Sequence, residues 1–427
     1  MADLKTIRRG FTGPEAELLQ LALLRAGFLL TPPDGIFGRE TEAALIRFQG
    51  MNGLTPDGIA GPKTWVALTP RLTGYFTHRV RAGDTLFRLA RSYYASLRAI
   101  ELANPGIDPL QLRVGSNVII PLPYPVVPDN VSFTPTLLEL VTDGLKKRYP
   151  FLRSASIGQS VMGRDLTVLS IGSGQNEVFY NAAHHANEWI TAPLLLRFIE
   201  DYAKAYADGG SIFGLRAGEL YGNTTLYAVP MVNPDGVALV TGEIRCGEYY
   251  EGAQRISANY PDIPFPSGWK ANILGVDPNL QYPAGWENAR RIKFAQGFVS
   301  PAPRDYVGRA PLEAPESRAV YNFTLAHDFS LTISYHTQGG EIYWRYLDME
   351  PPGAEKTAED FASVSGYTVS DAAYGSGYAG YKDWFIDRYF RRGYTIEAGR
   401  GQNPLPISML DEIYKENVGI FALGLTQ

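Results

Sequence analysis

The sequence predicts a multidomain chain with a small all-α bundle, a module of βααβ order and a larger α/β domain. Three patterns lead to this prediction: a duplicated Asp-Gly turn motif before helical stretches, a strand–turn–helix pattern that returns to a strand, and a long region in which strand-like and helical runs alternate. The 427 residues fit about two or three domains. An apolar fraction of 45% is enough for packed cores.

The helical bundle is predicted over residues 1–72, which contain a short internal repeat. The segment PDGIFGRET at 33–41 returns as PDGIAGPKT at 56–64. Each copy places Asp-Gly in a turn that leads into a helix, and Pro62 suits a first helical turn, where its missing N–H costs nothing. This doubled motif resembles the peptidoglycan-binding helical module that is often attached to cell-wall hydrolases.

The βααβ module is predicted over residues 76–123. The segment HRVRAGDTL at 78–86 indicates a strand, a turn and a helix capped near Asp84. The segment ANP at 103–105 ends a second helix, and VIIP at 118–121 forms the last strand. These phrases, in this order, resemble a LysM module, which binds glycans that contain N-acetylglucosamine. His78 is therefore expected to be a strand residue and not a metal ligand.

A proline-rich segment, residues 121–132, follows these modules and includes PLPYPVVP. Such a run is semi-rigid and extended. We expect it to be a linker that separates the two small modules from a catalytic domain over residues 130–427.

Chemically useful residues in this last domain follow predicted strands. The strands are expected at 166–171, 178–182, 225–232, 331–335 and 394–396, and a helix at 189–206. The strands at 178, 331 and 394 lead to His185, His336 and Glu397, and the strand at 225 leads to the segment NPDG at 233–236. Ligands of open α/β sheets bind beyond the carboxyl ends of the strands, so we expect these pieces to meet in one crevice.

The ligand set of one zinc ion is predicted from these residues. His185 and Glu188 are three residues apart, and His336 supplies a second imidazole. Two nitrogens and one carboxylate, with a fourth position open to water, suit catalytic Zn²⁺. With a single cysteine, Cys246, neither a disulfide within the chain nor a thiolate cluster is available. Glu397 is left over to move protons as general base and then acid.

These motifs resemble the zinc carboxypeptidase family, typified by carboxypeptidase A. The resemblance rests on His185-x-x-Glu188-Trp189, NPDG at 233–236, His336 and Glu397. It implies a mixed eight-stranded sheet flanked by helices, one zinc ion at the sheet edge and peptide-bond hydrolysis.

Departures from the family pattern bear on the substrate. The exopeptidases of the family hold the C-terminal carboxylate with an Asn-Arg pair, but here Asn279 is followed by Leu280, which offers no fork of donors. The oxyanion-supporting arginine of the family corresponds to Lys270, a catalytic candidate. The mobile substrate tyrosine corresponds to Tyr374, with Tyr378 as the rival.

A closer resemblance, to the bacterial γ-D-glutamyl-L-diamino acid endopeptidases, rests on WKAN at 269–272 and EAGRGQNPLP at 397–406. It implies cleavage between γ-D-glutamate and meso-diaminopimelate or lysine in wall stem peptides. Asn187, Asn279 and Tyr378 are substrate-binding candidates. Arg400 is expected to bind a substrate carboxylate, and the alternative for Arg400 is an internal salt bridge.

Peptidoglycan glycan strands and stem peptides are therefore the expected partners. The net charge of −5 gives no reason to expect nucleic acid, and the apolar run at 18–30 is too short to cross a membrane. The polar start of the chain shows no signal peptide, so a wall or spore setting, and a role in sporulation, follow only from the resemblance. Three alternatives stay open: an ordinary carboxypeptidase, an inactive wall-binding protein and a zinc deacylase of N-acyl amino acids. The oligomeric state is not predicted.

Overall fold

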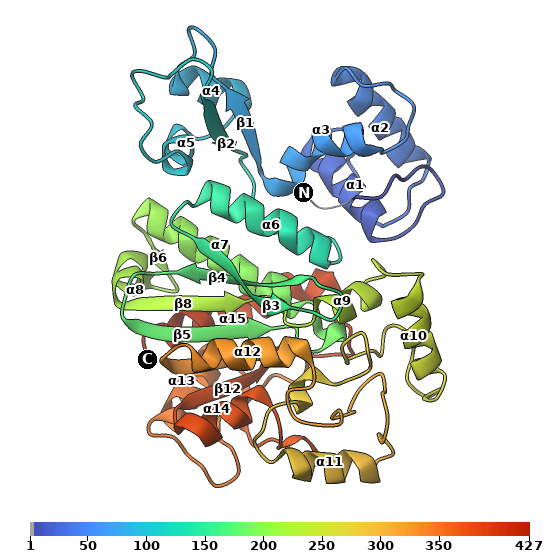
Figure 1. The fold of residues 1–427 in the computed structure, drawn as a ribbon. Helices are drawn as coiled ribbons and strands as arrows, with labels where there is room; N and C mark the ends of the chain where they lie inside the picture. Colours follow the sequence, from blue (N-terminus) through green and yellow to red (C-terminus); the bar gives the residue numbers. More distant parts are fainter. Residues whose placement is uncertain (1–3) are drawn as a thin grey trace. The chain divides into compact units, whose positions relative to one another are not determined.

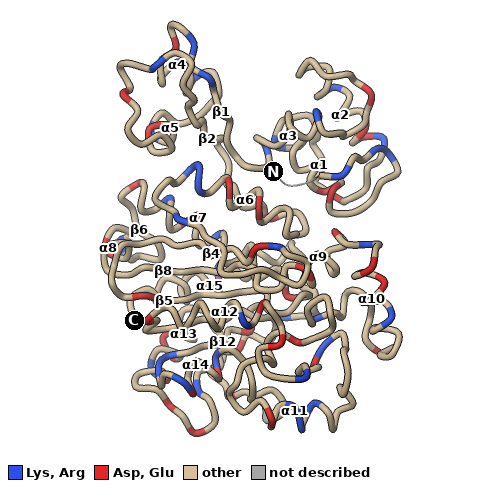
Figure 2. The backbone as a smooth tube through the Cα atoms, viewed as in Figure 1, with Lys and Arg blue, Asp and Glu red and all other residues tan. Residues whose placement is uncertain are grey.

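The computed structural model describes residues 4–427, apart from the side chain of Tyr374, so the first three residues of the polar N-terminal stretch lie outside it. The chain forms two compact units, residues 1–153 and 154–427 (Figure 1). Basic and acidic residues are interspersed along the backbone (Figure 2), and the sequence has 39 of the first kind and 44 of the second. No helix among the described residues has the length and apolar character needed to cross a bilayer.

The first unit begins with three helices, α1 (Pro14–Arg25), α2 (Arg39–Met51) and α3 (Pro62–Thr73). The two Asp-Gly turns of the repeat lie between them, and each is held by one buried glutamine. Gln20 Nε2 donates to Asp34 Oδ1 (2.6 Å), and Gln49 Nε2 donates to Asp57 Oδ1 (2.9 Å). Each glutamine Oε1 also accepts the N–H of the turn glycine. The repeat in sequence is thus a repeat in hydrogen bonding.

The βααβ module consists of β1 (Tyr75–Arg79), α4 (Leu86–Tyr93), α5 (Leu97–Ala103) and β2 (Asn117–Pro121), with β1 and β2 antiparallel. The predicted order is confirmed. The cap of α4 differs by one residue, because Thr85 accepts the N–H of Arg88 while Asp84 accepts that of Arg81. His78 lies in β1, as predicted, and its Nε2 contacts Asp84 Oδ2 (2.8 Å).

The proline-rich segment packs within the first unit. Arg25 donates to the carbonyl oxygens of Pro125 and Val126, and Val126 is fully buried. Arg148, in α6 (Pro135–Arg148), donates to the carbonyl of Tyr124. The first compact unit extends to Arg153 and so includes this segment and α6.

The second unit is built on an eight-stranded mixed sheet, with strands in the order β11-β10-β12-β9-β5-β8-β4-β3. Neighbours β8, β5, β9 and β12 are parallel, whereas β4 and β10 run antiparallel to their neighbours β8 and β12. The strand bounds are β3 (Arg153–Gln159), β4 (Asp165–Ile171), β5 (Asn176–Ala182), β8 (Thr224–Val229), β9 (Phe329–His336), β10 (Glu341–Tyr343), β11 (Thr368–Ser370) and β12 (Arg392–Glu397). The predicted mixed eight-stranded sheet is confirmed.

Helices cover both faces of this sheet (Figure 1). On one face, Phe179 of β5 packs in a cluster with Val320 and Tyr381, which belong to α12 (Pro315–Leu325) and α14 (Tyr381–Tyr389). On the other, Tyr180 donates to the carbonyl of Phe421 in α15 (Leu410–Gly424), which lies beside α7 (Thr191–Asp208) and α13 (Ala354–Ser365). Successive residues of β5 thus point to opposite faces, as the pleat requires. The remaining helices are α8 (Ala217–Asn223), α9 (Pro234–Val240), α10 (Glu248–Ser257) and α11 (Trp286–Ala295), and a small ribbon pairs β6 (Ser211–Ile212) with β7 (Leu215–Arg216).

Four parallel strands carry the predicted chemistry to one edge of the sheet. The last residue of β12, Glu397, is in register with the last residue of β9, His336. The adjacent β5 ends at Ala182, from which the chain passes through His185 into a short 3₁₀ turn, Ala186–Glu188. The crevice expected at the carboxyl ends of these strands is therefore where the site lies.

Candidate active site

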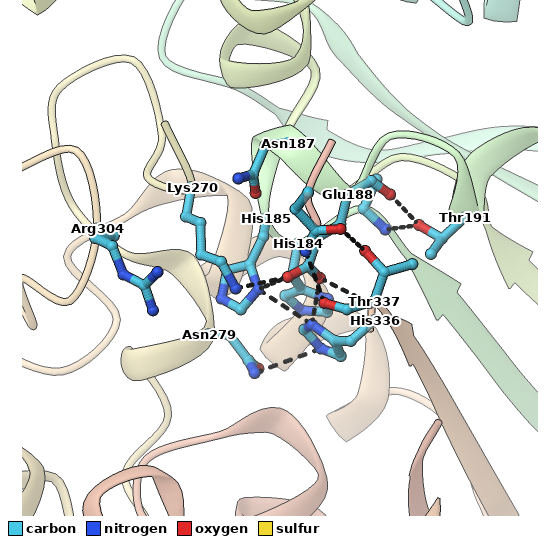
Figure 3. Close-up of polar contacts among 12 residues, drawn as sticks. His184, His185, Asn187, Glu188, Thr191, Lys270, Asn279, Arg304, His336 and Thr337 are labelled. Carbon is cyan, nitrogen blue, oxygen red and sulfur yellow. Dashed lines mark hydrogen bonds and ion pairs between the residues drawn. The ribbon is translucent and has the colours of Figure 1, made fainter. Parts of the chain in front are cut away.

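Three side chains converge as the metal-binding group that the sequence predicts (Figure 3). His185 Nδ1 lies 3.0 Å from one carboxylate oxygen of Glu188, and His336 Nδ1 lies 2.9 Å from the other. One ligand atom from each residue lies within 4.8 Å of the other two. The predicted set His185, Glu188 and His336 is therefore confirmed as the zinc-site triad.

The chemistry of these donors fits a divalent cation. The Nδ1 atoms of His185 and His336 lie only 3.2 Å apart, and both face the carboxylate. Burial opposes protonation of His185, yet the carboxylates of Glu188 and Asp277 raise its pKa to about 9. The two carboxylates thus favour a positive charge at the His185 imidazole. Two nitrogens and one carboxylate with an open position are the donor set of catalytic zinc.

Asp277 orients one ligand, a role that the sequence did not reveal. Its Oδ1 lies 3.3 Å from His185 Nε2, the nitrogen that faces away from the metal position. Asp277 is only 3% exposed, and although burial favours the neutral acid, His185 keeps the pKa of Asp277 below its ordinary value. A carboxylate on the second nitrogen fixes the tautomer and the orientation of a metal-binding imidazole. An acid two residues before Asn279 was the available signal.

Two cavities flank the triad, and four side chains line both of them: Lys270, Arg304, Tyr343 and Glu397. The Asn279 cavity, as we call the first, is lined also by Asn279, Leu280, Lys293, Lys382 and Asp383. The Asn187 cavity is lined also by Asn187, Asp262, Thr337, Gln338, Gln402 and Asn403. His185 and His336 line the Asn279 cavity, and the Asn187 cavity adjoins it through the four shared side chains.

Glu397 and Lys270 lie together at the junction of the two cavities. Removal from bulk water, together with the charge of Glu188, raises the pKa of Glu397 above its ordinary value. Lys270 Nζ lies 2.7 Å from Glu188 Oε1, and this carboxylate, against the effect of burial, raises the pKa of Lys270. The ammonium is therefore charged at neutral pH beside the metal position.

The Asn279 cavity does not contain the clamp of the exopeptidases. Asn279 Nδ2 lies 3.4 Å from His336 Nε2, and its Oδ1 accepts the N–H of Tyr381. Leu280 is 8% exposed and packs in an apolar cluster with Trp286 and Val307. The two lysines of the cavity, Lys293 and Lys382, are each 2.6 Å from an aspartate, Asp305 and Asp383 respectively.

Asn187 is one of the residues that line the Asn187 cavity. Its side chain is 4% exposed, and Nδ2 donates to the carbonyl of Ser267. Its Oδ1 has no hydrogen-bond partner within residues 4–427. A buried acceptor without a partner is costly, so this oxygen is suited to accept an N–H from a bound molecule.

Arg400 and the two tyrosines are placed differently from the triad. Arg400 Nη1 lies 3.2 Å from Glu416, its guanidinium stacks on Tyr367, and it lines neither cavity. This geometry favours the internal salt bridge over the predicted carboxylate-binding role. Tyr378 packs on Tyr346 and, behind Leu280, in apolar clusters, and it lines neither cavity itself. Tyr374 begins a 3₁₀ turn whose Ser376 lines the Asn279 cavity, while its own side chain lies outside the described structure.

Residues beside the ligands serve the scaffold. His184 is fully buried, contacts the hydroxyl of Tyr282 (3.0 Å) and stacks on His336. Asn233 caps α9 and donates to the carbonyls of His184 and Ala271. The NPDG segment thus fixes the loop that carries His185 and contributes no group to the cavities.

Comparisons with known proteins agree with this site. Residues 138–419 match the zinc carboxypeptidase family, residues 12–68 match a putative peptidoglycan binding domain, and residues 78–121 match the LysM domain. The two small domains imply peptidoglycan binding.

Relatives and solved structures cover the same region. A gamma-D-glutamyl-L-diamino acid endopeptidase 1 of Lysinibacillus sphaericus is 46% identical over 281 residues, which are 66% of this chain and 69% of the relative. An uncharacterised protein of Bacillus subtilis is 38% identical over 275 residues, 64% of this chain and 71% of that protein. Bovine thrombin-activatable fibrinolysis inhibitor, solved with a tick carboxypeptidase inhibitor, shares the fold with a TM-score of 0.52 at 18% identity, over 69% of this chain and 96% of that one.

Proposed function

The chain belongs to the zinc carboxypeptidase family, and we propose that it hydrolyses the bond between γ-D-glutamate and a diamino acid, meso-diaminopimelate or lysine, in peptidoglycan stem peptides. Leu280 carries this proposal. A buried leucine in an apolar cluster stands where the exopeptidases of the family need a guanidinium for the C-terminal carboxylate. The similarity to the L. sphaericus endopeptidase and the two wall-binding domains support the same substrate.

The residues at the junction of the cavities supply the acid–base chemistry. Zinc, when held by His185, Glu188 and His336, polarises the scissile carbonyl and lowers the pKa of a water molecule. Glu397 takes the proton from the attacking water and hands it to the leaving amine, first as base and then as acid. Its raised pKa suits both tasks, because an acid–base group works best when its pKa is near the working pH.

Lys270 stabilises the negative charge that develops on the carbonyl oxygen. Its ammonium is fixed beside the metal position through Glu188 and by the backbone, where the carbonyl of Lys270 accepts the N–H of Ala186 (3.0 Å). A cation held in advance near the developing charge lowers the barrier without reorganisation during the reaction. The Asn279 cavity takes the diamino acid, with Tyr374 proposed as its mobile contact, and the Asn187 cavity takes the glutamyl side.

Mass spectrometry of a purified L-Ala-γ-D-Glu-diaminopimelate peptide tests this function. We expect release of the diamino acid, loss of turnover with a zinc chelator, and a 10²–10⁴-fold lower rate for Glu397→Gln with its zinc content unchanged. Glu355→Gln, an exposed change in α13, is the matched control and should retain full activity.

Other outcomes would point to another function. Release of C-terminal residues from ordinary α-linked peptides, with the stem peptide left intact, would identify a carboxypeptidase. Binding to sacculi without hydrolysis of either substrate in the presence of zinc would identify a wall-binding protein.

A further inference from the structure

Arg304 presents the terminal nitrogens of its guanidinium where the two cavities meet. Its Nε donates to Asp305 Oδ2 (2.5 Å), and its two terminal nitrogens make no hydrogen bond within residues 4–427. The side chain is 43% exposed, and its guanidinium is turned towards Lys270 and the metal ligands (Figure 3). These two nitrogens are available to a ligand, whereas the ammonium groups of Lys293 and Lys382 in the Asn279 cavity are each paired with an aspartate.

The loop that carries Arg304 is tied to the metal centre. Asp305 has a φ of 66°, and its N–H donates to Asp277 Oδ2 (3.1 Å), while the other oxygen of Asp277 contacts His185. A non-glycine residue in the left-handed region is uncommon and persists where its surroundings hold it. Arg304 is therefore positioned by the same carboxylate that orients a metal ligand.

Backbone bonds join the same loop to the segment of Lys270. The carbonyl of Pro303 accepts the N–H groups of Lys270 (2.7 Å) and Ala271 (2.9 Å). The two basic side chains of the Asn187 cavity thus stand on adjoining backbone segments. Their tasks differ, because the Lys270 ammonium is engaged by Glu188 whereas the Arg304 guanidinium has free donors.

The ligand that this guanidinium suits is a carboxylate, which it binds through two parallel hydrogen bonds. A glutamyl residue linked through its side chain keeps a free α-carboxylate four bonds from the attacked carbonyl carbon, within roughly 5 Å at ordinary bond lengths. An α-linked residue has no carboxylate on its main chain there. We propose that Arg304 binds the free α-carboxylate of the γ-linked glutamyl residue and so selects γ-linked over α-linked amides. This inference rests on the proposed function.

Asn187 supplies the complementary acceptor in the same cavity. Its buried Oδ1 lacks a partner within residues 4–427, and the carbon that bears the glutamyl carboxylate also bears an amide N–H. A donor pair on Arg304 and an acceptor on Asn187 match the carboxylate and the N–H of that carbon. The cavity therefore offers groups for both polar substituents of a γ-linked residue.

A pair of substrates that differ at one group tests the proposal. The first is L-Ala-γ-D-Glu-diaminopimelate, and the second is the same peptide with the glutamyl α-carboxylate converted to a carboxamide. We expect Arg304→Gln to lower kcat/KM on the carboxylate peptide about 10- to 100-fold and to leave the carboxamide peptide within about threefold, because a hydrogen bond to a charged group is worth roughly that factor. Arg304→Lys should restore part of the loss. Arg309→Gln, an exposed change in the same loop, is the control.

Each other outcome is decisive. Equal losses on both peptides would overturn the proposal, since Arg304 would then support the site without recognising that carboxylate. A third peptide carries an amide in place of the C-terminal carboxylate of the diamino acid. If the loss in Arg304→Gln disappears on that peptide, the proposal is also overturned, because Arg304 would then bind the leaving group. If the unmodified enzyme hydrolyses neither γ-linked peptide, the proposed function is refuted instead. This outcome can be told apart from the others because it is seen with the unmodified enzyme alone.

Discussion

Asp277 is a single residue that bonds to two functional loops. One of its oxygens contacts His185, and the other accepts the N–H of Asp305 beside Arg304. Because both contacts use a charged acceptor, an amide in its place keeps the shape of the side chain but weakens the hold on the imidazole.

We expect Asp277→Asn to reduce zinc affinity 10- to 100-fold, the range found when an orienting partner of a metal-binding histidine is changed. Competition with a coloured chelator measures the affinity directly. Asp262→Asn, in the lining of the Asn187 cavity, is a control that should leave zinc binding unchanged. Unchanged affinity in Asp277→Asn would mean that packing alone orients His185.

Glu316, at the start of α12, is a buried acid that makes stability depend on pH. It is fully buried and accepts hydrogen bonds from the N–H of Val161 and from Asn272, each 3.1 Å. Burial raises its pKa to about 7. The folded chain therefore keeps the proton at pH values where the unfolded chain has released it, so the contribution of Glu316 to stability falls as pH rises from about 4.5 to 7.

Glu316→Gln, which cannot ionise, should lack this loss. Relative to the unmodified chain, the free energy of unfolding of the variant should rise by about 2–3 kcal/mol between pH 5 and pH 8. The size follows because a shift of one pKa unit corresponds to about 1.4 kcal/mol. Denaturant titrations at several pH values give this difference. Glu313→Gln is the control. Arg309 and backbone N–H groups, against the effect of burial, lower the pKa of Glu313, so the stability difference between this variant and the unmodified chain should not change between pH 5 and 8. A level difference for Glu316→Gln as well would contradict the prediction.

At the scale of elements, the strands that carry the ligands could be predicted, because each is an apolar run buried on both faces of the sheet. The short strands β10 and β11 could not, because three residues each are too few to show a period. The roles of Asp277 and Arg304 could not be predicted for another reason. Their roles depend on contacts between loops that no local spacing encodes, and the same holds for Arg400, whose partner Glu416 lies in a distant helix.

The glutamines of the helical module show a similar limit. The repeated Asp-Gly phrases were visible, but Gln20 lies 14 residues before its aspartate and Gln49 only 8 before its own. Because these distances differ, the glutamines are not part of the sequence repeat. The structure is needed to show that each turn is held by a side chain of the preceding helix.

The two turns therefore act as controls for one another. Gln49→Ala removes bonds to Asp57, Ile59 and Thr64 and leaves the N–H of Gly58 without its acceptor. We expect a local cost of about 2–4 kcal/mol and faster hydrogen exchange in residues 55–64. Gln20→Ala should loosen residues 33–41 instead. Unchanged exchange at the turn that faces the altered glutamine would contradict this account.

For the whole molecule, the matched peptidoglycan-binding and LysM domains and the metal-binding cluster occupy different parts of the sequence. The metal-binding cluster lies in the second unit, and the described residues 4–123 contain no group of three potential ligands within reach of one ion. We therefore expect a zinc chelator to abolish hydrolysis while co-sedimentation with sacculi is unchanged. Loss of both would show that wall binding depends on the occupied metal site.

Linking two weak binding modules to a catalytic domain raises the effective substrate concentration only when glycan and peptide belong to one polymer. A soluble N-acetylglucosamine oligomer should thus slow hydrolysis of sacculi at least about 10-fold, since gains from linkage are of the order of 10²–10⁴. Hydrolysis of a free stem peptide should be unaffected, because that substrate never engages the modules. A glucose oligomer without N-acetyl groups is the control, and release of diaminopimelate is the readout in both assays. Equal inhibition of both substrates would place the glycan in the catalytic cavities and remove the case for capture by the modules.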